Sequence, residues 1–343
     1  MAASKMKQAG GKDSNNQQAE TIVNQVNIAL APLDEMAKVV LENAFGGVPA
    51  TTLKQVEDNQ SSFKSIFVDE LKKIVAQVND IEKIVNSPDF QYVSKKALLS
   101  ASRSGEVDMH QDLSHLVVQR MLHDESDIKR FVFNEAIEVI NKLTDNQLKI
   151  LSLCFLGKYV IWNDVLTKEQ LNNVLKKFFV PLLDVELTNS QFQYLEYVGC
   201  SNNSSIGGKS HFKQFIKRKY PMSLSEGIDA ESIQNFDDYE LIKFGDKYKI
   251  PYVNLETMKN SLFEKGFSEE KIQRHVNLYN QMVGKRVLNS DDDIPSLFTK
   301  GSELNEVYSW FGSMNLTAVG IAIAITHLEK VVGEKWNVDI WIN

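Results

Sequence analysis

The chain has 343 residues, of which 43% are hydrophobic and 24% are charged, so its composition is that of a globular protein rather than a disordered one. Its net charge of −7 argues against general nucleic-acid binding, which needs a basic field to displace counterions from phosphates. With only 7 prolines and 17 glycines, it has few turn residues for a β-sandwich or barrel, and this favours helices.

The first 28 residues are the most distinctive part of the chain. A polar, glycine-bearing run over residues 8–18 precedes residues 21–28 (TIVNQVNI), whose β-branched side chains predict a short strand. A lone strand has two unpaired edges, so this one would be a disordered tail or would pair, most simply with the strand of another copy. In a paired arrangement Ile22, Val26 and Ile28 would share one face.

Apolar spacing predicts a helical bundle over residues 29–142. Residues 33–44 form a first helix that ends at Gly46-Gly47, and further helices are expected at 89–102, 107–122 and 128–143. The longest predicted helix, residues 52–86, has an a/d stripe that fits a coiled coil with another chain. We prefer packing within the protein's own bundle, because sustained coiled coils need about three or four heptads. The stripe consists of Phe67, Leu71, Ile74, Val78, Ile81 and Val85.

The rest of the chain is predicted to be helical with a small amount of β structure. Thr-x-x-Gln capping boxes at Thr144, Thr167 and Thr188 predict three helix starts in a middle region, residues 143–225. The C-terminal region, residues 226–343, is predicted to be α+β, with a strand at 336–342 (WNVDIWI). Its helices are expected at 236–249, 254–265, 268–283 and 321–331. The predicted fold class is mainly α: a helical bundle with a short N-terminal β tag (1–28) and a small C-terminal α+β portion.

No pattern predicts a catalytic or metal site, and we expect no cofactor. His110 and His115 are five residues apart, whereas two metal ligands on one helix face need a spacing of three or four. His115 is therefore expected to be a packed or surface histidine. The acidic run at residues 291–293 lacks the EF-hand spacing and is interpreted as a loop.

Residues 199–219 are the best candidate for a ligand site, although a structural role is preferred for each part. Residues 208–210 (GKS) match the end of a phosphate-binding loop, but the first glycine of that motif falls on Asn203. Cys200 could be a nucleophile beside a histidine base, yet a structural thiol is favoured. Residues 209–220 mix basic and aromatic side chains. We interpret them as an amphipathic helix whose solvated basic side holds Lys213, Lys217 and Tyr220, rather than as a nucleic-acid site.

Cysteine usage and apolar segments indicate a cytoplasmic protein without membrane contact. Cys154 and Cys200 are the only cysteines, and both are expected to be reduced core thiols. The chain start lacks the apolar stretch of a signal peptide, and the most apolar later stretch, residues 316–328, is too short to span a bilayer.

Several stretches together resemble an uncharacterised bacterial family whose members carry a short Gly/Asn/Gln tag ahead of a helical body. The resemblance implies a bacterial cytosolic protein and brings no active site with it. Tags of this kind also precede unrelated domains in bacterial defence proteins. The stretches are the tag at 8–25, SPDFQYVSKKALLSASRSGEVD (87–108), LTDNQLKILSLCFL (143–156), LEYVGCSNNSSIG (195–207) and NLTAVGIAIA (315–324).

Three functions remain open from the sequence. The preferred one is a self-assembling bacterial interaction protein, in phage defence or a stress response, whose copies meet through the N-terminal tag or the helix 53–85; another protein is a further possible partner. The second is an enzyme or small-ligand sensor with its site near residues 199–219. The third is a DNA-binding regulator built on the C-terminal region, which the acidic net charge disfavours.

Overall fold

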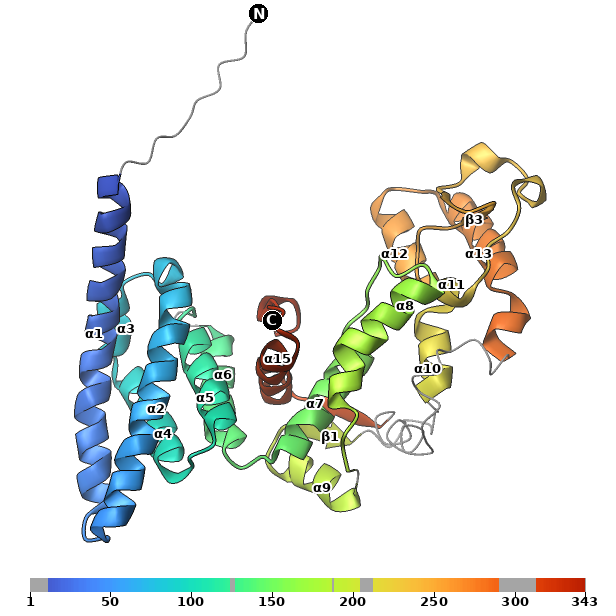
Figure 1. Ribbon diagram of the computed structural model, residues 1–343. Helices are drawn as coiled ribbons and strands as arrows, with labels where there is room; N and C mark the ends of the chain where they lie inside the picture. The colour runs from blue at the N-terminus through green and yellow to red at the C-terminus, as the bar shows by residue number, and fades with distance from the viewer. Residues whose placement is uncertain (1–11, 124–126, 187, 204–211, 290–312, 343) are drawn as a thin grey trace, which may run out of the picture. The chain divides into compact units, whose positions relative to one another are not determined.

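The computed structural model describes residues 12–123, 127–186, 188–203, 212–289 and 313–342 (Figure 1). The protein is mainly α-helical, as predicted, and its described strands form two small two-stranded sheets. The chain divides into two compact units, residues 1–145 with 318–343 and residues 146–317. The C-terminal helix therefore belongs to the same unit as the N-terminal helices. Among the described residues, no helix combines the length and apolar character needed to cross a membrane.

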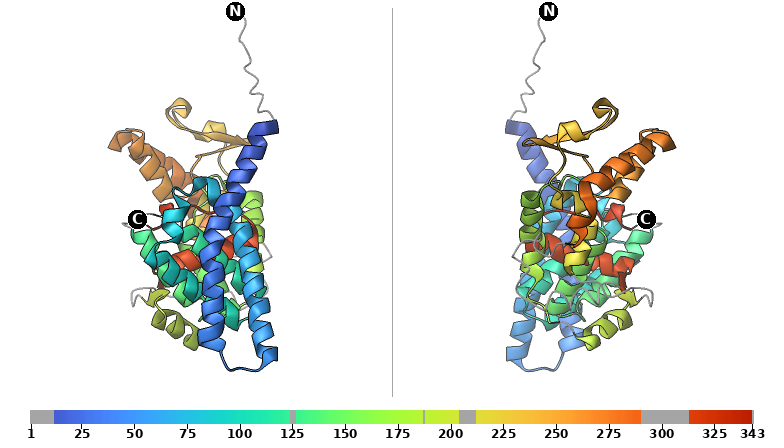
Figure 2. Two further views of the ribbon diagram at one scale, coloured as in Figure 1. Left: turned by 90° about the vertical axis from the view of Figure 1, so that its left-hand side faces the viewer. Right: turned by 90° about the vertical axis from the view of Figure 1, so that its right-hand side faces the viewer.

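The first unit is a bundle in which α1 and α2 run side by side in opposite directions, joined by a turn at Gly47 (Figure 2). Helix α2 packs on α1, α4 and α5, while α15 packs on α5 and α6. The α-helices of this unit are α1 (Lys12–Phe45), α2 (Ala50–Ile74), α3 (Ile81–Val85), α4 (Pro88–Arg103), α5 (Val107–Arg120), α6 (Ile128–Ile140) and α15 (Ala318–Val332). Its 3₁₀ turns are η1 (Val75–Gln77) and η7 (Val338–Ile340).

The predicted N-terminal strand is wrong, because residues 21–28 belong to α1. Burial of one apolar helix face outweighs the β propensity of the branched side chains in this segment. Pro32 lies inside the same helix and has no N–H, so the carbonyl of Ile28 receives no hydrogen bond from position 32. The buried face consists of Val26, Ala29, Leu33, Ala37 and Val40.

The a/d stripe of residues 67–85 packs inside the first unit, which confirms the preferred interpretation. Each of its six side chains is at most 7% exposed. The stripe is not carried by one helix, since the predicted helix 52–86 is divided into α2, η1 and α3. The division falls at Asp80, which has a φ of 53° and whose carboxylate accepts a hydrogen bond from the Lys83 N–H at the start of α3.

The second unit contains short helices, many of which begin where capping residues predict. Helices α7, α8 and α9 each begin directly after one of the three predicted threonines, and the complete capping box forms at Thr167. The α-helices are α7 (Asp145–Lys158), α8 (Lys168–Val174), α9 (Asn189–Tyr197), α10 (Phe212–Lys219), α11 (Pro221–Leu224), α12 (Leu255–Glu264) and α13 (Glu269–Asn289). The π turn η2 (Leu175–Phe179) and the 3₁₀ turns η3 (Val180–Leu182), η4 (Ala230–Ser232) and η5 (Phe236–Asp238) connect them.

The β structure of this unit differs from the prediction. Strands β2 (Ile242–Phe244) and β3 (Lys247–Lys249) form a hairpin, so the helix predicted over residues 236–249 is wrong. Its two-residue turn contains Gly245, whose φ of 60° suits glycine. Strand β1 (Ser201–Asn203) pairs antiparallel with β4 (Met314–Leu316). The strand predicted at 336–342 is also wrong, because residues 338–340 form η7.

Candidate functional site

A buried charge cluster holds three helices of the first unit together. His115 of α5 has its Nδ1 3.5 Å from Glu70 Oε2 of α2 and its Nε2 3.1 Å from Glu329 Oε2 of α15. All three side chains are mostly buried, His115 being 17% exposed. Glu329 also accepts a hydrogen bond from the Trp336 N–H at 2.7 Å, so it fixes the chain just beyond α15.

The surrounding carboxylates keep His115 charged at neutral pH. Burial opposes the charge, but hydrogen bonds to Glu329 and Glu70 raise the pKa of His115 to about 9. The hydrogen bond from His115 in turn lowers the pKa of Glu70 to about 2. Both ring nitrogens of this imidazolium carry a proton, so neither can accept one, and the arrangement is unsuited to general-base catalysis.

A second ion pair lies one helical turn away. Lys330 Nζ is 2.8 Å from Asp112 Oδ2, and the Asp112 carboxylate is almost completely buried. Burial raises the pKa of Asp112 despite the attraction of Lys330. A cavity of about 480 Å³ is lined by both ion-pair groups and by Lys73. Because His115 pairs with Glu329 and Asp112 pairs with Lys330, the arrangement acts as a polar clamp between α5 and α15.

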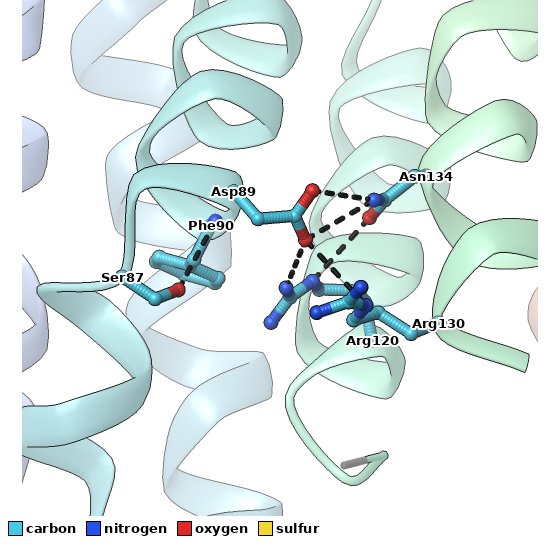
Figure 3. Close-up of polar contacts among 6 residues, drawn as sticks. All are labelled: Ser87, Asp89, Phe90, Arg120, Arg130 and Asn134. Carbon is cyan, nitrogen blue, oxygen red and sulfur yellow. Dashed lines mark hydrogen bonds and ion pairs between the residues drawn. The ribbon is translucent and has the colours of Figure 1, made fainter. Parts of the chain in front are cut away.

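A further polar network fixes α4, α5 and α6 (Figure 3). Arg120 donates to Asp89 and, through Nε at 3.3 Å, to Asn134 Oδ1. Asn134 Nδ2 lies 3.1 Å from Asp89 Oδ1, and Arg130 Nε is 3.8 Å from Asp89 Oδ2. Partial burial opposes ionisation of Asp89, but the hydrogen bonds from Arg120 and Asn134 lower its pKa. Such a connected network orders the three helices rather than presenting a reactive group.

Another histidine of the first unit, His110, is held by polar contacts in the core. His110 is fully buried, with Nδ1 3.1 Å from Ser62 Oγ and Nε2 2.8 Å from the Ser104 carbonyl. His115 is a packed histidine, one of the two alternatives expected. Within the described ranges, no group of three or more His, Cys, Asp or Glu side chains is placed to hold a metal ion.

The candidate ligand segment at 199–219 is only partly visible. Cys200 is completely buried, its N–H donates to the Leu195 carbonyl, and its carbonyl accepts from the Thr317 N–H, in agreement with a structural thiol. Burial raises the pKa of the other thiol, Cys154, to about 12, so it is not a ready nucleophile either. The GKS stretch (208–210), His211 and the acidic run 291–293 lie outside the described residues.

The expected solvated basic side of α10 is wrong. Lys217 is 3% exposed and Tyr220 is buried, whereas Arg218 is exposed; the side chain of Lys213 lies outside the described set. Lys219 is buried as well, and its Nζ donates to the carbonyls of the last turn of α7, with the Leu156 oxygen at 3.2 Å. A lysine at this position complements the partial negative charge of a helix C-terminus.

A second buried lysine is bound in the same way. Lys249 Nζ donates to the Leu166 carbonyl at 2.8 Å and to the Met222 carbonyl at 3.1 Å. Burial lowers the pKa of Lys219 to about 7 and that of Lys249 to about 8. These two amines fasten helix ends and turns by their hydrogen bonds to the main chain.

Stability of the second unit is expected to rise between pH 7 and pH 9. Lys219 has a folded pKa of about 7 against an ordinary value of 10.5, so between pH 7 and pH 9 the folded protein releases this proton while the unfolded chain keeps it, and the free energy of unfolding rises with pH. The gain is about 2 kcal/mol for this group. Urea unfolding at pH 7 and pH 9 should show that the unfolding free energy of the wild type rises by this amount relative to that of Lys219→Met. An unchanged difference between the two proteins at pH 7 and pH 9 would contradict it.

The clamp residues of the first unit were not identified from the sequence. Glu70, Asp112 and the Glu329-Lys330 pair come from three helices, and each looks like an ordinary helix charge. The available signal is in α15, a mostly apolar helix in which Glu329 and Lys330 stand side by side near the C-terminal end. A charged pair on a helix of that character indicates a buried partner.

The N-terminal end of α1 forms a surface of a different kind. Helix α1 continues past the end of α2 (Figures 1 and 2). In the N-terminal half of α1, the apolar side chain of Val23 is 58% exposed. Polar side chains surround Val23 and line a depression: Glu20, Thr21, Asn24 and Gln25.

Comparison with known proteins identifies a family but no activity. A family model with the description “:-like” matches residues 30–342, beginning after the N-terminal tag. No curated protein and no solved structure matches the chain. Since the match covers most of the sequence, the chain belongs to the family that this model describes.

Proposed function

We propose that this protein is a self-associating interaction protein whose copies meet through the N-terminal turns of α1. The observation that carries the proposal is the 58% exposure of the apolar Val23 in the N-terminal half of α1, a helix that continues past the end of α2 (Figure 1). The sequence resemblance supports a setting in the bacterial cytoplasm, in phage defence or a stress response.

A projecting helix end favours a partner on physical grounds. Most helical stability in proteins comes from packing of an apolar face, and short unsupported helices are marginal in water. Ala19, Glu20 and Thr21, the residues before Ile22 whose side chains are described, are all exposed. Contact between the α1 helices of two copies would supply this packing, with helices taking the place of the strands that the sequence predicted.

Val23→Asp in the full chain is expected to shift the assembly toward the monomer, because it places a charge in the proposed contact. The measurement is solution mass by light scattering over a range of concentrations. Val107→Asp is the matched control, since Val107 is similarly exposed but lies at the start of α5. A wild-type protein that stays monomeric at every concentration would contradict the proposal. Equal effects of Val23→Asp and Val107→Asp on the solution mass would exclude α1 as the contact.

A further inference from the structure

A groove of about 610 Å³ lies between α1 and α4. Its apolar surface comes from Pro32, Met36 and Val39 of α1 and from Pro88 and Tyr92 of α4. Tyr92 is 56% exposed although it is a large aromatic residue, and Lys96 Nζ lies 5.2 Å from its ring centre. Exposed tyrosines of this kind are frequent anchors of protein interfaces.

The α1 wall of the groove is a second apolar face of that helix. Ile28, Pro32, Met36 and Val39 recur at spacings of 4, 4 and 3, and all four are half-buried. This stripe lies beside the fully buried face that packs inside the first unit. A helix with apolar residues on two faces is typical of one that has neighbours on both. The Ile28 carbonyl, which lacks a donor from position 32, lies on this second face.

The two walls of the groove carry opposite charges. Glu35 lies on the α1 wall and Lys95 on the α4 wall, and both are exposed. Neither has an ion-pair partner in the part of the chain that the structure describes. A two-fold contact places the α1 wall of each copy against the α4 wall of the other, so that Glu35 meets Lys95 of the second copy twice. The groove is therefore complementary in charge to itself.

We propose that this α1–α4 groove binds the same groove of a second copy of this chain through a two-fold axis. The inference rests on the proposed self-association and assigns it a second surface, in addition to the contact through Val23. Val23 precedes Pro32 by nine residues, or two and a half helical turns, so it lies on the opposite side of α1. The groove contact and the Val23 contact can thus form together, and one copy can bind two others.

Charge reversal tests the pairing directly. Glu35→Lys and Lys95→Glu each place like charges together at both symmetric positions, and each is expected to weaken association about tenfold or more. The double variant Glu35→Lys/Lys95→Glu restores the pairs with exchanged signs and should recover the wild-type dissociation constant. Lys54→Glu, an exposed lysine on α2 outside the groove, is the matched control and should leave association unchanged. Sedimentation velocity on the full chain provides the readout.

The outcomes separate this inference from the proposed function. If the wild-type protein never associates, both the proposed self-association and the groove contact are overturned. An associating wild type that is insensitive to either single variant overturns the groove and leaves self-association standing. Weakening by the single variants without recovery in the double variant also overturns the groove pairing. Weaker association of both single variants, with wild-type association of the double variant, supports the groove pairing whatever the effect of Val23→Asp.

Discussion

Replacing His115 by leucine is expected to lower the free energy of unfolding of the first unit by about 3 kcal/mol at pH 7. The imidazolium lies between Glu70 and Glu329, 3.5 and 3.1 Å away, and it is the positive group that both carboxylates share. Without it, two mostly buried negative charges face each other across an apolar side chain. Breaking a buried charge pair on one side is strongly destabilising because it leaves the remaining charge unpaired. Urea denaturation of the two proteins measures the difference.

The triple variant Glu70→Gln/His115→Leu/Glu329→Gln is the control for this prediction. Removing the negative charges together with the positive one should recover most of the lost stability, since no unpaired charge remains. A triple variant as unstable as His115→Leu would show that packing, and not charge, explains the loss.

The effect of His115→Leu also has a defined pH dependence. The folded pKa of His115 is raised to about 9 from 6.5, so its contribution is full below 6.5 and is lost as the pH rises through 9. The folded pKa of Glu70 is lowered to about 2, so its contribution is present above 4.5 and is lost as the pH falls through 2. The difference between wild type and His115→Leu should thus be largest near pH 5 to 6 and small at pH 10.

Phe67→Ala is expected to destabilise the first unit by about 3–5 kcal/mol, the usual cost of deleting a buried phenylalanine. Phe67 is completely buried in the bundle, and its ring is 6.3 Å from that of Phe63. The loss combines the removed apolar burial with the cavity left among the helices. Chemical denaturation gives the magnitude, and light scattering on the same samples gives the mass.

The control is Phe263→Ala on α12, where the ring is 77% exposed and the expected change is within about 0.5 kcal/mol. The mass measurement decides between the two interpretations of the 67–85 stripe. If Phe67 contacted another chain, the alanine variant would dissociate while its unfolding free energy stayed unchanged. That result would contradict the internal packing seen here.

Local signals in the sequence predicted many helices with small errors. Ser87-Pro88 marks the start of α4, and the Ser87 hydroxyl accepts a hydrogen bond from the Phe90 N–H as a helix cap does. Thr167 forms its predicted capping box with Gln170 at the start of α8. These positions depend on residues within one turn of each other, so the chain needs no distant contact to define them.

The errors arose where short-range propensity competed with a longer pattern. Residues 21–28 contain enough β-branched side chains to suggest a strand, yet Val26 and Ala29 continue the apolar face of α1 that ends near Val40. Residues 236–249 were predicted to be helical, but Gly245-Asp246 forms a two-residue turn that joins β2 to β3. Residues 336–342 alternate like a strand but have no strand to pair with among the described residues, and η7 forms instead.

By itself the sequence determined the mainly helical class, the positions of many helix ends and the internal apolar stripe of residues 67–85. These follow from spacing and from capping residues close together in the chain. Only the tertiary structure decided that α15 returns to the first unit, and with it that Glu329 reaches His115 and Lys330 reaches Asp112. No local pattern encodes such pairs, because a charge on one helix is matched only when packing brings the other helix to it.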